Sequence, residues 1–173
     1  MKNIFKKLSF IFKKILLRNS NKIKIGSNVK IYESNGKIFF GNNIYIGDNV
    51  NLYAKSGDLH IADNVHISMG SILVAERADC KVGENTMIAE YVSIRTCSHG
   101  IRKNQNMISQ KEKGKSITLG KDVWIGRGSV ILEGTSIEDG VVIGANSVVK
   151  KNSNLKAYGV YAGNILRFIK WRE

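Results

Sequence analysis

Proline is absent from the 173 residues, so turns have to be made by the 17 glycines and by Asn and Asp. There are only two cysteines, Cys80 and Cys97, which excludes a framework of several disulfides and fits a reducing compartment. No apolar run is long enough to cross a bilayer, and lysines interrupt the stretch that could serve as a signal peptide. We therefore expect a cytoplasmic protein of one domain with a sizeable core.

Acidic residues are missing from the first 30 positions, which carry nine of the net +13 positive charges. The other 143 residues together carry only +4. The basic character is therefore a property of the N-terminus and does not indicate a nucleic-acid groove across the domain.

Residues 1–20 are expected to form a basic amphipathic helix, because apolar residues recur there at helical spacing and lysines occupy most of the other face. Two interpretations remain open. Residues 1–18 could lie on an anionic membrane, at the inner face of the cell membrane. The same apolar face could instead pack on its own domain or on a neighbouring subunit.

Apolar residues recur every six positions through most of the chain. From residue 119 the register runs without adjustment through Leu119, Ile125, Ile131, Ile137, Ile143, Val149 and Leu155. Upstream, blocks of the same register begin at Phe40, Ile61 and Val82, that is, at intervals of 18 residues plus a three-residue insertion. Four positions after each apolar residue the side chain is usually small or β-branched, as at Ser71, Thr86 and Ser129.

A period of six within a period of eighteen predicts an all-β triangular solenoid, in which each hexad is one short strand plus a corner. The apolar residue points to the axis, and Gly or Asn at the corners accepts a positive φ. A β-sandwich would instead show period two with turn clusters every 8–12 residues.

The repeat is interrupted once, at residues 95–116, where the sequence is polar and basic. The apolar register jumps 25 residues from Ile94 to Leu119. The corresponding step in the preceding coil, from Leu73 to Val82, is nine residues, so about sixteen residues are inserted at one corner. A loop of that length without a pattern of its own is usually functional or disordered. His99 stands near its start.

The segments "IGDNV", "KVGENTMIAEYVSI" and "ITLGKDVWIGRGSVILEGTSIEDGVVIGANSVV" resemble the hexapeptide-repeat acyltransferases. Within that superfamily the chain looks most similar to sugar O-acetyltransferases, including galactoside and maltose enzymes and those of capsule and O-antigen. The resemblance implies a left-handed parallel β-helix over residues 21–162, with an extruded loop at 95–116. It also implies a homotrimer, and a short helical tail is expected at residues 163–173.

The resemblance also implies that His99, in "CSHG", is the general base. Acetyl transfer from a thioester requires that the acceptor hydroxyl lose its proton as it attacks, and an imidazole suits that task near neutral pH. Without the motif, His99 would pass for an ordinary loop histidine. Cys97 is a less suitable candidate for a nucleophile, because it would need a base positioned for a thiolate and the family uses no cysteine here.

The same resemblance predicts an acetyl-CoA site. Trp124 is expected to line the channel beside the histidine, close enough to count with the catalytic residues, and Arg127 and Ala145 to contact the pantetheine arm. The phosphates of coenzyme A would meet cationic side chains of the last coil and the tail, namely Lys150, Lys151, Arg167 and Lys170. A solvated run of charges is the alternative interpretation of those four.

No metal is expected, because a zinc site on this fold needs three convergent histidines and His60 and His66 fall on adjacent faces. The predicted function is O-acetylation of a glycan or sugar precursor of a surface polysaccharide. Alternatives are an amino-sugar N-acetyltransferase, a drug-inactivating acetyltransferase and a non-catalytic scaffold.

Overall fold

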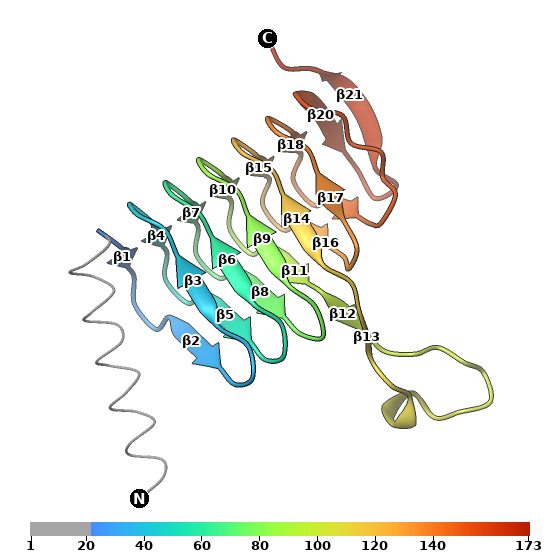
Figure 1. Ribbon diagram of the computed structural model, residues 1–173. Helices are drawn as coiled ribbons and strands as arrows, with labels where there is room; N and C mark the ends of the chain where they lie inside the picture. The colour runs from blue at the N-terminus through green and yellow to red at the C-terminus, as the bar shows by residue number, and fades with distance from the viewer. Residues whose placement is uncertain (1–21) are drawn as a thin grey trace, which may run out of the picture.

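The computed structural model describes residues 22–173, and short β-strands wind there into a triangular solenoid of about seven turns (Figure 1). Strands of the solenoid pair in parallel with their equivalents one coil away; Tyr45 aligns with His66, His66 with Met87 and Met87 with Trp124. The predicted left-handed parallel β-helix is confirmed. The predicted helix at residues 1–20 lies outside the described residues.

The strands of the solenoid form three sheets, which we call faces A, B and C. Face A contains β1 (Lys24–Ile25), β4 (Tyr45–Ile46), β7 (His66–Ile67), β10 (Met87–Ile88), β15 (Trp124–Ile125), β18 (Val142–Ile143), β20 (Gly159–Ala162) and β21 (Arg167–Trp171). Face B contains β2 (Lys30–Glu33), β5 (Asn51–Ala54), β8 (Ile72–Ala75), β11 (Ser93–Arg95), β16 (Val130–Ile131) and β19 (Val148–Val149). Face C contains β3 (Ile38–Phe40), β6 (Leu59–Ile61), β9 (Cys80–Val82), β14 (Ile117–Leu119) and β17 (Ser136–Ile137).

The core is a stack of the residues that the six-residue register predicts. On face B, Leu52, Leu73, Ile94 and Ile131 align in successive strands and are fully buried. The second core position holds small residues that can bond to the corner backbone; Ser71 Oγ, for example, donates to the Ala89 carbonyl at 2.8 Å. Small polar side chains therefore close the corners without leaving a buried hydroxyl unpaired.

Asparagine residues build the corner between faces C and A. Asn43, Asn64 and Asn85 adopt φ values of 54°, 58° and 59°. Their side chains form a ladder, in which Asn43 donates to Asn64 at 2.9 Å and Asn64 donates to Asn85 at 3.0 Å. The amide side chain explains the choice of Asn, since it tolerates this conformation and also links successive coils.

All the insertions of the repeat fall at the corner between faces B and C. The first three coils have three extra residues there, between β2 and β3, β5 and β6, and β8 and β9. In the next coil the whole polar segment leaves at the same corner through the antiparallel pair β12 (Cys97–Ser98) and β13 (Lys113–Gly114). Beyond that pair the loop projects from the solenoid and contains the 3₁₀ turn η1 (Met107–Ser109) (Figure 1).

The prediction of a helical tail at residues 163–173 was wrong. The chain turns back at Gly163, where φ is 109°, and β21 pairs antiparallel with β20. Phe168 packs edge-on against Tyr161 at 5.5 Å between ring centroids. The last coil leaves the edge of face A open, and the tail pairs with that edge, whereas a lone short helix would be marginally stable in water. None of the helices within residues 22–173 has the length and hydropathy needed to cross a membrane.

Candidate active site

Residues 95–116, which we call the histidine loop, leave the solenoid where faces B and C meet. A carboxylate on the returning limb of this loop faces His99. His99 Nε2 lies 3.7 Å from Glu112 Oε1, and the His99 side chain is 61% exposed. Glu112 is half-buried and is held from its other side by Arg77, whose Nε lies 3.2 Å from Oε2. The pairing of β12 with β13 brings the two limbs together, because it places Cys97 opposite Gly114 and Ser98 opposite Lys113.

Gln110 braces the interior of this loop. Its Oε1 accepts a hydrogen bond from the backbone N–H of Arg102 at 2.7 Å. Its Nε2 donates to the carbonyls of Arg102 and Gln105, each at 3.0 Å. The side chain is buried, so a single residue fixes both limbs beyond His99 and gives a loop without sheet structure a defined shape.

Cys97 lies at the base of the loop, where its surroundings oppose ionisation. Burial, the charges of Glu76 and Glu112 and a hydrogen bond to Glu76 raise the pKa of the Cys97 thiol, with burial the largest cause. A thiol that stays protonated is a poor nucleophile, which agrees with the preference for His99 as the reactive group. Glu76, Cys97 and Glu112 offer three possible metal ligands within 4.8 Å, but Lys55 and Arg77 already pair with the two carboxylates.

A groove of about 480 Å³ runs along face A across β7, β10, β15 and β18. Trp124 stands in it with its side chain half exposed, as the outward position before the buried Ile125 predicts. Arg127 and Ala145 line the same groove at the corner between faces A and B. The remaining lining is mostly small or apolar, and it also includes His66, Met87 and one acidic residue, Glu90. Such a narrow channel suits an extended arm that offers amide groups to the strand backbone.

Among the described residues that line this groove, Arg127 alone carries a permanent positive charge. Its guanidinium carbon lies 5.4 Å from the centroid of the exposed Tyr91 ring, which occupies the same corner in the preceding coil. The aromatic face holds the arginine along the groove without neutralising its charge, so it can still attract an anionic ligand.

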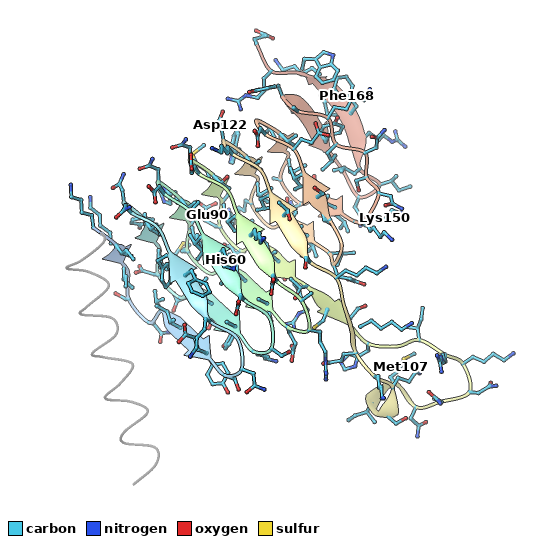
Figure 2. The ribbon with its side chains drawn as sticks, viewed as in Figure 1. His60, Glu90, Met107, Asp122, Lys150 and Phe168 are labelled. Carbon is cyan, nitrogen blue, oxygen red and sulfur yellow. The ribbon has the colours of Figure 1, made fainter. Side chains whose placement is uncertain are left out.

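The four predicted phosphate-binding residues do not lie in the groove lining. Lys150 and Lys151 follow β19 at the corner between faces B and C, and Figure 2 labels Lys150 there. The Lys150 N–H donates to the Ser153 hydroxyl. Arg167 and Lys170 lie on β21, which extends face A beyond the end of the groove, and Lys170 pairs with Glu173 at 2.9 Å. Their proposed contacts with phosphate thus need a ligand that extends past the groove.

The other two histidines stack on aromatic neighbours one coil away. His60 lies against Phe39 on face C with ring centroids 4.7 Å apart, and His66 meets Tyr45 edge-on at 4.3 Å on face A. They lie on adjacent faces as the six-residue spacing predicts, so they do not converge with His99.

Within one chain, the histidine loop and the groove are separated by the width of the solenoid. The loop leaves from the corner where faces B and C meet, and face A is the side of the triangle opposite that corner. No residue of the loop lines the groove in the described part of the chain. One chain therefore presents two half-sites that point in different directions.

The repeat matches the model of the bacterial transferase hexapeptide family, described as six repeats, over residues 116–151. Among solved structures, the chain is similar to a maltose O-acetyltransferase from Clostridium difficile 630, with 31% identity over 87% of this chain and 70% of that one and a TM-score of 0.55. The chain belongs to the hexapeptide-repeat acyltransferases. It is therefore an acyltransferase by family.

Two other relatives place the family likeness in context. A variant of AntD, an N-acyltransferase from Bacillus cereus in complex with dTDP and coenzyme A, is 25% identical, with 92% of this chain and 88% of that one covered and a TM-score of 0.68. The acetyltransferase VCA0836 from Vibrio cholerae, complexed with acetyl coenzyme A, is 22% identical, with 94% of this chain and 78% of that one covered and a TM-score of 0.57. At that identity the likeness supports the shared fold alone. No curated protein matches the chain.

The sequence pattern did not reveal Glu112 as the partner of this acyltransferase's loop histidine. Glu112 is 13 positions from His99, and only the β12–β13 pairing shows that they face each other. A signal was present, because Glu112 is the only acidic residue between Arg95 and Ser116. A histidine in a loop that is otherwise basic makes such a lone carboxylate the obvious candidate for its partner.

Proposed function

We propose that the protein is an acetyl-CoA-dependent O-acetyltransferase that modifies a hydroxyl of a glycan or sugar precursor, with His99 as the general base. The observation that carries this proposal is the pair of half-sites, a groove suited to a pantetheine arm and a braced loop that presents a histidine facing a carboxylate. The maltose O-acetyltransferase relative supports acetylation of oxygen on a sugar. The coenzyme A bound to the AntD relative supports a coenzyme A thioester as the acetyl donor.

The two half-sites form a complete site only if chains associate. We propose a homotrimer, in which the loop of one chain reaches the groove on face A of its neighbour, because closed rings are built from such head-to-tail contacts. Face A offers exposed apolar side chains for this contact, among them Tyr45, Met87 and Trp124. Each of the three interfaces would then hold one His99 and one donor groove.

The reaction in this site needs no covalent enzyme intermediate. The acceptor oxygen bonds to the carbonyl carbon of the thioester while His99 accepts the hydroxyl proton. In the observed orientation Nε2 faces Glu112, which leaves Nδ1 to take the proton. Glu112 then stabilises the imidazolium. When the carbon–sulfur bond breaks, the thiolate of coenzyme A leaves and the imidazolium returns the proton to it.

Arg127, Ala145 and Trp124 would hold the pantetheine arm, and the cations beyond the groove would meet the phosphates. In a trimer the corner that carries Lys150 and Lys151 belongs to the chain that supplies the loop, so these lysines approach the donor from the opposite side to Arg127. Arg167 and Lys170 extend face A on the chain that supplies the groove. Phosphates of one coenzyme A could thus be bound from both chains.

The test is turnover of acetyl-CoA, measured as release of free thiol, with a panel of maltose, galactosides, sugar nucleotides, capsular and O-antigen glycans and amino sugars. We expect a sugar hydroxyl to stimulate release, and the product to lose its acetyl group in neutral hydroxylamine, which cleaves esters and spares amides. Stimulation only by an amino sugar, with a hydroxylamine-resistant product, would assign the enzyme to N-acetylation, the alternative that the AntD relative favours.

A further inference from the structure

Two tyrosines on the first coils of face B form a surface that the donor groove and the loop do not use. Tyr32 on β2 and Tyr53 on β5 are aligned in register, with ring centroids 6.1 Å apart and planes tilted by 54°. Together with Ser34 and Lys55 they line a shallow hollow of about 340 Å³. We call these four residues the tyrosine platform.

The tyrosine platform is connected to the histidine loop through successive strands of face B. Lys55 pairs with Glu76 of the next coil at 3.0 Å, and Glu76 accepts a bond from the Cys97 thiol at 3.6 Å. His99 follows two residues after Cys97. Parallel strands lie about 4.8 Å apart, so the platform strand β5 is roughly 10 Å from β11, which leads into the loop. In Figure 1, β2, β5, β8 and β11 follow one another toward β12.

The chemistry of the tyrosine platform fits an uncharged sugar chain. A tyrosine ring offers a flat apolar surface to the C–H face of a pyranose, while its hydroxyl remains available for hydrogen bonds. The Ser34 hydroxyl and the Lys55 ammonium lie beside the rings and can bond to sugar hydroxyls. Lys55 already pairs with Glu76, so the surface lacks the excess positive charge that a phosphate-rich ligand such as a nucleic acid would require.

We propose that the tyrosine platform binds an oligosaccharide acceptor, one end of which reaches His99 of the same chain. This inference rests on the proposed function and narrows it, because it assigns a short glycan chain as the substrate class in place of a monosaccharide or a sugar nucleotide. Donor and acceptor then reach the histidine from different directions. The donor groove spans β7 to β18 on face A, and the platform lies on the earlier strands β2 and β5 of face B.

The test is binding of maltotriose, triacetylchitotriose and galactotriose to the full-length protein without acetyl-CoA, followed by saturation-transfer NMR and titration. We expect at least one of the three to bind the wild type. The double change of Tyr32→Ala and Tyr53→Ala should weaken that binding tenfold or more. Tyr32→Trp, which keeps a flat ring, should retain most of it. Both tyrosines are at the surface, so these changes should leave the fold intact.

Phe39→Ala is the matched control. Phe39 lies in the same coil as Tyr32, is similarly exposed and stacks on an aromatic neighbour, but it belongs to face C. Equal loss of binding in the control and in the double variant would overturn the proposal, as would failure of the wild type to bind any of the three sugars at millimolar concentration. A double variant that changes only the oligomeric state, with sugar binding retained, would overturn it too, because the platform would then be a subunit contact.

The binding assay separates this inference from the proposed function. A wild type that binds maltotriose through the tyrosines but releases no thiol would contradict the O-acetyltransferase and leave the platform standing. If the enzyme is active but the double substitution leaves its Michaelis constant for the oligosaccharide unchanged, the O-acetyltransferase stands and the tyrosine platform is contradicted. If both are correct, the Michaelis constant for the trisaccharide rises at least tenfold in the double variant while that for acetyl-CoA does not change.

Discussion

Replacing His99 with alanine is expected to lower kcat for acetyl transfer by a hundredfold or more, in line with the loss of a general base. The Michaelis constant for acetyl-CoA should change little, because a general base acts on the acceptor proton in the transition state and does not hold the pantetheine arm. The measurement is thiol release at saturating acetyl-CoA with the acceptor that the panel identifies. His60→Ala is the matched control, since His60 stacks on Phe39 away from both half-sites, and it should retain full activity.

The substitution Glu112→Gln measures how much the carboxylate contributes to the function of His99. Gln keeps the size of the side chain but removes the negative charge 3.7 Å from the imidazole, so we expect a loss of about tenfold, less than the loss of the base itself. If His99→Ala left kcat within about threefold of the wild type, the general-base role would be refuted, whatever the effect of Glu112→Gln.

Replacing Ile94 with alanine is expected to destabilise the solenoid by about 2–5 kcal/mol, the usual cost of emptying a fully buried isoleucine site. Ile94 is 0% exposed and lies between Leu73 and Ile131, its partners in the adjacent coils. Strands above and below fix both neighbours, so the cavity cannot collapse easily. Urea unfolding at one fixed protein concentration measures the change, since association adds to apparent stability.

The control for Ile94 is Ile101→Ala. Ile101 is the same residue type seven positions later, but it is 82% exposed on the loop, so its loss should change the free energy of unfolding by less than about 0.5 kcal/mol. A cost below about 1 kcal/mol at Ile94 would show that the inward column does not hold the coils together as the packing indicates.

The solenoid could be predicted because every coil has the same pattern of buried and exposed positions. Each coil buries the same positions, so an apolar residue every six positions and a small one four later are enough to indicate the inward column and the tight corners. The burial of Leu52, Ser71 and Ile131 follows that register. Asn at the corners was predictable for the same reason, because positive φ recurs at the corners of successive coils.

The features that could not be predicted are not repeated. The tail after Gly163 contains one run, Arg167–Trp171, whose apolar and basic residues have no second copy to reveal a period. Its conformation is decided by the open edge of β20, which is a tertiary contact. The partnership of His99 with Glu112 likewise depends on one hairpin at the base of the loop.

The position of the lysines was also decided by the three-dimensional arrangement. Lys150 and Lys151 follow β19 directly in sequence, and the resemblance placed them on the donor. In space they occupy the corner of the loop, across the solenoid from the groove. Sequence adjacency to the last coil indicated their height along the solenoid correctly, but not the side of the triangle on which they lie.

If each active site combines the loop of one chain with the groove of another, subunit complementation will reveal it. Ala145→Trp should fill the groove and His99→Ala removes the base, so either variant alone is expected to be inactive. Co-assembled in equal amounts as trimers, they should regain about a quarter of wild-type thiol release, because one interface in four joins an intact groove to an intact histidine. Activity that stays at the level of the separate variants would contradict a shared site.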